Sequence, residues 1–253
     1  MGLLLPLEMT ALAALVFIAL RRRRKQGAAH AGLDVPERIR DALTGAGIPA
    51  RLAEALATEA AIFYYALASW RRRPLTPPGS RAFAYHRRNA YAAILYAVVG
   101  IALVELTAVD LVVRTSHATV ANVLLGVDAL AAIWMLGFVR SVQLRPILLR
   151  DDALLIRNGL GASVDVPRAT ATIQFGRVRA PAKGTPGYFR VAMGQPNALI
   201  TLREPAVVRR MYGAGRVVDR IGLVLDDPRG FETAWNSLVP ESPTTPAGLG
   251  RPT

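Results

Sequence analysis

Two long apolar runs dominate the pattern of hydrophobic and polar positions along the chain, at residues 90–113 and 119–139. Only the short polar segment 114–117 separates them. An α-helix rises about 1.5 Å per residue, so each run is long enough to cross the roughly 30 Å hydrocarbon core of a bilayer. Because the break is too short to hold a domain, the pattern predicts a transmembrane helical hairpin over residues 90–140.

A shorter apolar stretch at residues 2–20 is followed at once by the basic cluster 21–25. A secretory signal has the opposite order, with its positive charge before the apolar core and a small-residue cleavage site after it. Residues 1–25 are therefore predicted to form an uncleaved transmembrane anchor. Its amino end would lie outside and its basic cluster in the cytoplasm.

Residues 26–89 form a polar connector with two helical candidates. The first covers residues 36–43 with Asp34 near its start, and the second runs from about residue 50 to residue 70. If the second helix crossed the membrane, the basic clusters on its two sides would face opposite compartments, against the positive-inside bias. We therefore expect three spans, with four as the alternative. The helix at 50–70 would then lie at the interface, with Tyr64, Tyr65 and Trp70 near head-group level.

After residue 140 the pattern changes to short runs of alternating apolar and polar residues separated by turn residues. Such spacing predicts a compact antiparallel β domain over residues 141–239. Asp227 and Pro228 are typical of a helix start, and Phe231, Trp235 and Leu238 follow on one apolar face. A short helix should therefore close the β domain, and the Pro- and Gly-rich tail 240–253 should be disordered. The predicted fold class is α+β.

The amino-acid composition excludes several classes of function. The net charge is +13, almost entirely from Arg, and much of that charge flanks the apolar runs, which favours membrane orientation over nucleic-acid binding. The absence of Cys excludes disulfides, thiol catalysis and Cys-ligated metals. The three histidines are scattered, so neither a metal nor another cofactor is predicted. Low Lys with high Ala and Arg is typical of a bacterial chain from a GC-rich genome.

Several segments carry a family resemblance. Residues 145–149, 152–159 and 164–167 resemble the opening strands of bacterial PH-like domains, with Ala153 where Gly is common and Arg168 where an aromatic residue often stands. The whole chain is also similar to uncharacterised bacterial integral membrane proteins that carry this domain behind a helical hairpin. The resemblance implies a PH-like antiparallel β-barrel capped by a C-terminal helix. It also implies a membrane location and no established activity. With three spans, the positive-inside bias places the β domain on the cytoplasmic side of the bacterial inner membrane.

Acidic residues inside the apolar runs are the first candidate site. Glu105 and Asp128 should reach similar depth in an antiparallel hairpin, and Glu59 comes from the neighbouring helix. Inserting an acidic side chain at the bilayer centre costs about 2.5–3.5 kcal/mol, so such a residue is expected to have a bonding partner or a functional role. Three interpretations stay open: a proton or cation site, protonated side chains that hydrogen-bond the helices together, and an oligomer interface.

The second candidate is the basic loop of the β domain, with Arg177, Arg179, Lys183 and nearby Arg190. Anionic head groups or an acidic protein segment would dock there, and the alternative is a solvated loop. No nucleophile–base set or catalytic motif is present. We therefore expect a non-catalytic interaction or scaffold protein. The first alternative is a small transport component that uses the membrane acids, and the weakest alternative is a lipid-acting enzyme. The expected partners are membrane lipid, a protein at the β domain and a second copy of the chain, with no nucleic acid.

Overall fold

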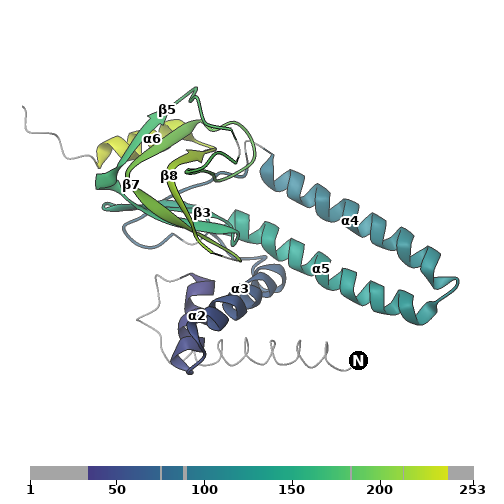
Figure 1. Cartoon of the computed structure of the whole chain (residues 1–253). Coiled ribbons are helices and arrows are strands. Elements are labelled where there is room, and N and C mark those ends of the chain that lie inside the picture. Colours follow the sequence, from purple (N-terminus) through teal and green to yellow (C-terminus); the bar gives the residue numbers. More distant parts are fainter. Residues whose placement is uncertain (1–33, 75, 88–89, 183, 213, 239–253) are drawn as a thin grey trace, which may run out of the picture.

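The computed structural model describes residues 34–74, 76–87, 90–182, 184–212 and 214–238. Its fold is α+β: a pair of N-terminal helices, a long helical hairpin and a β domain closed by a short helix (Figure 1). The predicted anchor at residues 1–25 and the tail at 240–253 lie outside the described residues.

The N-terminal pair consists of α2 (Val35–Gly45) and α3 (Ala50–Leu67). Helix α2 begins with the capping box that its sequence encodes. The Asp34 carboxylate accepts the Val35 N–H at 2.7 Å, and the Glu37 carboxylate accepts the Asp34 N–H at 3.1 Å. Ile39 and Leu43 of α2 pack against the small alanine face of α3, which lets the two helices lie close together.

The predicted hairpin is formed by α4 (Tyr91–Arg114) and α5 (Ala118–Leu144), which pack against each other and project away from the β domain (Figure 1). Both helices are long and apolar enough to cross a membrane, and only 11% of the most apolar window of each is buried within the protein. Helix α5 extends four residues beyond the predicted hairpin end at residue 140, because its last turns pack against α3 and the β domain. At Gly137 a Cβ would lie 2.2 Å from the Ile62 carbonyl oxygen, so glycine permits this close contact.

The second connector helix, α3, packs between α2 and α5 and is not among the helices long and apolar enough to span a membrane. The predicted position of Tyr65 near head-group level stays a prediction, but the Tyr65 side chain is not available to contact head groups. Its side chain is only 3% exposed, because its hydroxyl is used inside the protein. Trp70, by contrast, is 52% exposed.

Among its described residues, the β domain has eight strands in an open, mixed sheet with the order β1-β2-β3-β4-β7-β8-β6, and β5 pairs with β7. The elements are β1 (Arg81–Phe83), β2 (Ile147–Leu149), β3 (Ala153–Asn158), β4 (Ala162–Pro167), the 3-10 helix η2 (Arg168–Thr170), β5 (Ala171–Phe175), β6 (Tyr188–Arg190), β7 (Ala198–Arg210), β8 (Arg216–Leu223) and α6 (Pro228–Ser237).

Two features of this sheet differ from the predicted closed antiparallel barrel. Strand β6 runs parallel to β8, and the edge strands β1 and β6 do not pair with each other among the described residues, so the sheet stays open. Strand β1 also precedes the hairpin in the chain, yet it pairs with β2. The β domain therefore takes a strand from the segment that was predicted to be connector.

The core of the β domain lies between the curved sheet and α6. The predicted helix start is confirmed, because the Asp227 carboxylate accepts the Gly230 N–H at 2.9 Å. Phe231 is fully buried and meets Phe83 of β1 edge-on, with 4.8 Å between ring centroids. This contact joins the strand before the hairpin to the helix at the end of the domain.

Candidate functional site

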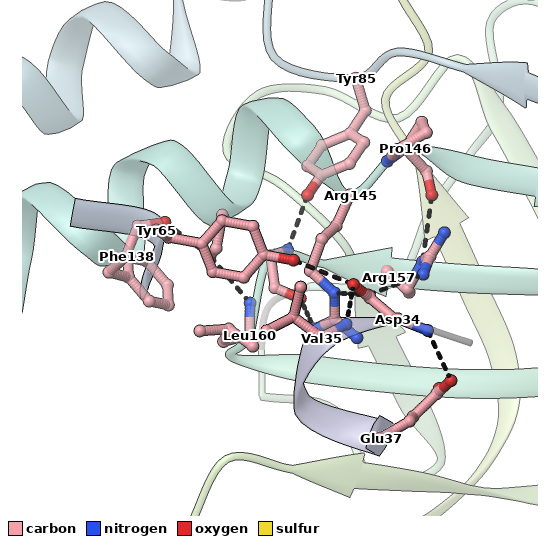
Figure 2. A network of polar contacts seen from close by, with 12 residues as sticks. Asp34, Val35, Glu37, Tyr65, Tyr85, Phe138, Arg145, Pro146, Arg157 and Leu160 are labelled. Atoms are coloured by element: carbon pink, nitrogen blue, oxygen red, sulfur yellow. Dashed lines mark hydrogen bonds and ion pairs between the residues drawn. The ribbon is translucent and has the colours of Figure 1, made fainter. Parts of the chain in front are cut away.

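A buried ionic cluster joins the helical and β parts of the protein (Figure 2). One Asp34 carboxylate oxygen accepts hydrogen bonds from Arg145 Nε at 2.5 Å and from Arg157 Nη1 at 3.0 Å. The other oxygen accepts the Tyr65 hydroxyl at 3.0 Å. Asp34 is 4% exposed and Arg157 is 2% exposed, so these charges are removed from water. We call this group the Asp34 cluster.

Four structural elements meet at the Asp34 cluster. Asp34 is the N-cap of α2, Tyr65 lies on α3, Arg145 follows α5, and Arg157 lies on β3. Both guanidinium groups also donate to backbone carbonyls, Arg145 to Gly159 and Arg157 to Pro146. The cluster therefore fixes the end of the hairpin against the sheet and against the N-terminal helices.

The electrostatics of the Asp34 cluster indicate a structural joint. Burial raises the pKa of the Asp34 carboxyl, but the charges of Arg145 and Arg157 and the hydrogen bonds from Arg145 and the Val35 N–H outweigh burial and lower it. Burial and the neighbouring Asp34 charge raise the pKa of Tyr65 well above its ordinary value. Asp34 thus stays ionised and Tyr65 stays protonated. The cluster has no group ready to exchange a proton near neutral pH.

The three predicted membrane acids are not joined in one cluster by hydrogen bonds or ion pairs among the described residues. Glu59 lies on α3, where its carboxylate accepts the indole N–H of Trp134 at 3.2 Å and the hydroxyl of Tyr212. The Glu105 side chain on α4 is exposed on the surface of the protein, and Asp128 on α5 is half-buried. Glu59 therefore connects α3 to α5 and to the β domain, while the roles predicted for the other two acids stay predictions.

The predicted basic loop is divided in the structure. Arg177 and Arg179 are exposed in the segment between β5 and β6, and Lys183 lies outside the described residues. Arg190 belongs to β6, donates to the Gly194 carbonyl at 3.1 Å, and lines a separate recess of about 390 Å³ beside the start of α4. The docking role predicted for these residues stays a prediction.

A second basic site, which the sequence analysis did not identify, lies where the hairpin meets the rest of the protein. It is a recess of about 550 Å³, which we call the hairpin-base recess. Its basic lining residues are Arg72, His86, Arg87 and Arg140, and no Asp or Glu is among its described lining residues. The remaining lining comes from Pro74, Ala90, Ala92, Ala93, Tyr96, Gln143 and Leu144.

Arg140 is held firmly at one side of the hairpin-base recess. Its Nη1 donates to Gln143 Oε1 at 2.5 Å, and its Nη2 donates to the Ser69 carbonyl at 3.2 Å. The guanidinium also lies over the Trp70 ring, 5.0 Å from the ring centroid. Its Nε is buried and has no hydrogen-bond partner in the described structure.

His86 lies on another side of the recess. It is 9% exposed, and its Nδ1 is buried without a hydrogen-bond partner in the described structure. Burial lowers the pKa of His86, the Asp226 charge raises it, and the Arg87 charge lowers it, with a net decrease that keeps the ring neutral at pH 7. The Arg87 backbone N–H is held by both carboxylate oxygens of Asp226, at 3.0 and 3.1 Å.

The basic residues of this recess come from three separate segments: the end of the α3 region, the stretch after β1, and the end of α5. In the sequence, residues 71–73 and 87–88 are visible as basic flanks of apolar runs, and that pattern indicates membrane orientation only. Their convergence with Arg140 depends on how α3 packs against α5. Among the described residues, no group of three or more His, Asp or Glu side chains is placed to hold a metal ion.

Comparisons with known proteins do not add to this picture: no protein-family model, no curated protein and no solved structure matches the chain.

Proposed function

We propose that this chain is a non-catalytic integral membrane protein of the bacterial inner membrane, whose hairpin holds an interaction or scaffold domain at the cytoplasmic surface. The observation that supports it best is the apolar surface that the hairpin leaves uncovered. Large side chains such as Ile101, Val104, Leu111 and Val112 are 59–71% exposed from the protein. In water such a continuous apolar surface favours aggregation, whereas lipid is its natural solvent.

The end of α5 is joined closely to the β domain. Helix α5 ends at Leu144 and β2 begins at Ile147, with Arg145 of the Asp34 cluster between them. Strand β1, which precedes the hairpin, also belongs to the sheet, so the chain enters and leaves the hairpin through strands of the β domain. A rigid connection of this kind suits a domain that presents a surface at a fixed height above the membrane.

We propose three spans rather than four, and the contacts of α3 support this. The C-terminal end of α3 contacts the base of the hairpin, because Tyr65 donates to Asp34, which binds Arg145 after α5, and the carbonyl of Ser69 accepts Arg140 Nη2. The middle of α3 contacts the β domain, where the Glu59 carboxylate accepts the Tyr212 hydroxyl. Because α3 contacts both the hairpin base and the β domain, it is proposed to lie at the cytoplasmic side. The predicted anchor would supply the third span.

The β domain is proposed to be PH-like, with an open sheet in place of a closed barrel. Helix α6 covers the core at one end of the sheet, and this supports the resemblance seen in the opening strands. Protein–protein docking on the domain would then use exposed strand and loop surfaces. Arg177 and Arg179, which are exposed in the long loop, are candidates for such contacts.

A second candidate function is a proton- or cation-coupled component that works as an oligomer. Glu105 is exposed on an apolar helix, and the described residues provide it with no hydrogen-bond or ion-pair partner. In a bilayer such an acid is favoured if a second copy of the chain shields it. An E105Q variant that folds, stays oligomeric and loses ion coupling would support this function, whereas unchanged oligomerisation and transport would exclude it.

The membrane proposal is tested by extraction and by site-directed labelling. The natural chain has no Cys, so single cysteines at Ser80, Ser116 and Thr201 report unambiguously. In intact spheroplasts, a membrane-impermeant maleimide should label the Ser116→Cys variant, and it should label the other two only after the membrane is opened. The protein should also resist alkaline carbonate extraction. Release into the supernatant, or labelling of the Thr201→Cys variant in intact spheroplasts, would disprove the proposal.

A further inference from the structure

We infer that the hairpin-base recess is a binding site for the phosphate of an anionic phospholipid head group. The inference rests on the membrane location proposed above, because the recess would then open at the cytoplasmic head-group layer. The ligand chemistry is a phosphate ester with a net negative charge, and the source is lipid of the inner leaflet.

Charge is the first reason. Three arginines line the recess together with His86, and none of the described lining residues is acidic. The side chains of Arg72 and Arg87 are exposed, so they are free to turn toward a ligand. Guanidinium groups match the geometry of phosphate oxygens, since each offers several parallel N–H donors.

Unused hydrogen-bonding capacity is the second reason. Buried polar atoms almost always have a partner, so exceptions need an explanation. Two residues that line this recess each have such an atom, Nδ1 in His86 and Nε in Arg140. Arg140 is already fixed through its other two nitrogens, so its orientation is set before a ligand arrives. A phosphate oxygen is an acceptor that satisfies the Nε–H, and the neutral His86 ring can donate or accept through Nδ1.

Position is the third reason. The lining comes from the first turns of α4 and the last turns of α5, which are the ends of both candidate spans on the same side. Trp70, which stacks on Arg140, is half exposed, as aromatic residues are at the head-group level of membrane proteins. Exposed apolar residues of α4, beginning with Ala93 and Ile94, continue from the recess along the hairpin. They offer a path for acyl chains.

Size and shape agree with a head group. At about 550 Å³ the recess falls within the range of small-molecule sites, about 300–1,000 Å³. The recess beside β6 also has three arginines in its lining, but only α4 of the hairpin contributes to it, whereas both α4 and α5 line the hairpin-base recess. The hairpin-base recess is therefore the better site for one phosphoglycerol head group.

The test measures lipid retention by the full chain. Protein purified in a neutral detergent is titrated with phosphatidylglycerol or phosphatidylcholine, and bound lipid is counted by native mass spectrometry. The wild type should retain phosphatidylglycerol in preference to phosphatidylcholine. The double variant R72Q/R87Q changes two exposed side chains. Each basic residue near a charged surface contributes about fivefold to binding, so the loss of both should weaken phosphatidylglycerol binding by about thirtyfold.

The matched control is R177Q/R179Q, which removes the same charge from the exposed loop of the β domain. It should change binding by less than about twofold, because these arginines do not line the recess. An Arg140→Lys variant keeps the charge but removes the Nε donor, and it should also lose most of the preference. Equal losses in both double variants would overturn the inference, because they would show general charge attraction.

Two further outcomes separate the possible failures. If inorganic phosphate or glycerol phosphate displaces the lipid at equal concentration, a soluble phosphate is the ligand and the lipid assignment is overturned. If wild-type protein resists carbonate extraction yet shows no preference for phosphatidylglycerol, the inference fails while the membrane proposal stands. If the protein is released by carbonate, the proposed function itself fails.

Discussion

Replacing Asp34 by Asn tests whether the Asp34 cluster holds the helices to the β domain. The substitution preserves shape, and Asn is as good an N-cap as Asp, so helix α2 keeps its start. What disappears is the single negative charge that faces Arg145 and Arg157, which are 6% and 2% exposed. Two buried guanidinium groups would then lack a counter-charge.

The magnitude follows from the cost of an unpaired buried charge. Removing one partner of a buried ion pair destabilises a protein by about 3–5 kcal/mol. For a chain of this size, about 1 kcal/mol shifts the melting temperature by about 2–4 °C. We therefore expect the D34N variant to melt about 6–20 °C lower than the wild type. Tryptophan fluorescence of the full chain in neutral detergent follows the transition, and limited proteolysis shows whether α2 and α3 detach first.

The matched control is D41N, the same substitution on the same helix. Asp41 pairs with Arg40 at 3.4 Å, and both side chains are 34–41% exposed. Exposed pairs contribute about 0–1 kcal/mol, so D41N should shift the melting temperature by about 4 °C at most. Equal shifts in D34N and D41N would refute the view that the buried charge of Asp34 stabilises this joint.

Three further predictions follow from particular contacts. Because the folded protein lowers the pKa of Asp34 below its ordinary 3.8, its stabilising effect is full above that pH and is lost as the pH falls through the folded-state value. The melting temperature of the wild type should therefore fall more steeply in acid than that of D34N, and parallel pH profiles would contradict this. G137A forces a Cβ to within 2.2 Å of the α3 backbone and should cost about 1–3 kcal/mol in thermal unfolding. G126A, which meets open space, should cost nothing, and equal losses would argue against the α3–α5 contact. F231A empties the centre of the β core and should lower the free energy of unfolding by about 3–5 kcal/mol. The control V217A, on the exposed face of β8, should change it by no more than about 0.5 kcal/mol. Small effects of both substitutions would show that α6 does not cover the core.

Elements with strong local signals were predictable from the sequence. The hairpin was visible because each helix is a continuous apolar run, and lipid-facing helices need no alternation of polar and apolar residues. Helix α6 was visible because Asp227 and Pro228 mark its start and two aromatic residues follow at helical spacing. In both cases a short stretch of chain contains all the information that its conformation requires.

Long-range pairing was not predictable in the same way. Strand β1 has three residues and pairs with β2 across the whole hairpin, so nothing in its own sequence indicates a strand. Asp34 carries a clear capping signal, but its counter-ions lie 111 and 123 residues further along the chain. The parallel pairing of β6 with β8, which keeps the sheet mixed, likewise depends on where a long loop returns to the sheet.

The candidate site shows why residue type and flanking position are not enough. Arginines at the base of the hairpin look alike in the sequence, and the positive-inside bias explains all of them equally. In the structure they divide into two groups. Arg145 and Arg157 are neutralised in part by one carboxylate and hold the fold together. Arg72 and Arg140, by contrast, line a recess whose described lining contains no acidic group.

This division has a physical consequence for the protein at a membrane. In the Asp34 cluster one carboxylate faces two guanidinium groups, so the cluster has a single net positive charge, and that charge is buried away from a lipid surface. Charges in the hairpin-base recess remain available, and their position beside the first turns of α4 and the last turns of α5 confines that attraction to one level of the molecule. The bilayer would therefore act on this chain at two separate places, apolar contact along the hairpin and phosphate contact at its base. On this proposal, two such contacts would restrain the height and the tilt of the hairpin together, and the Asp34 cluster would transmit both to the β domain.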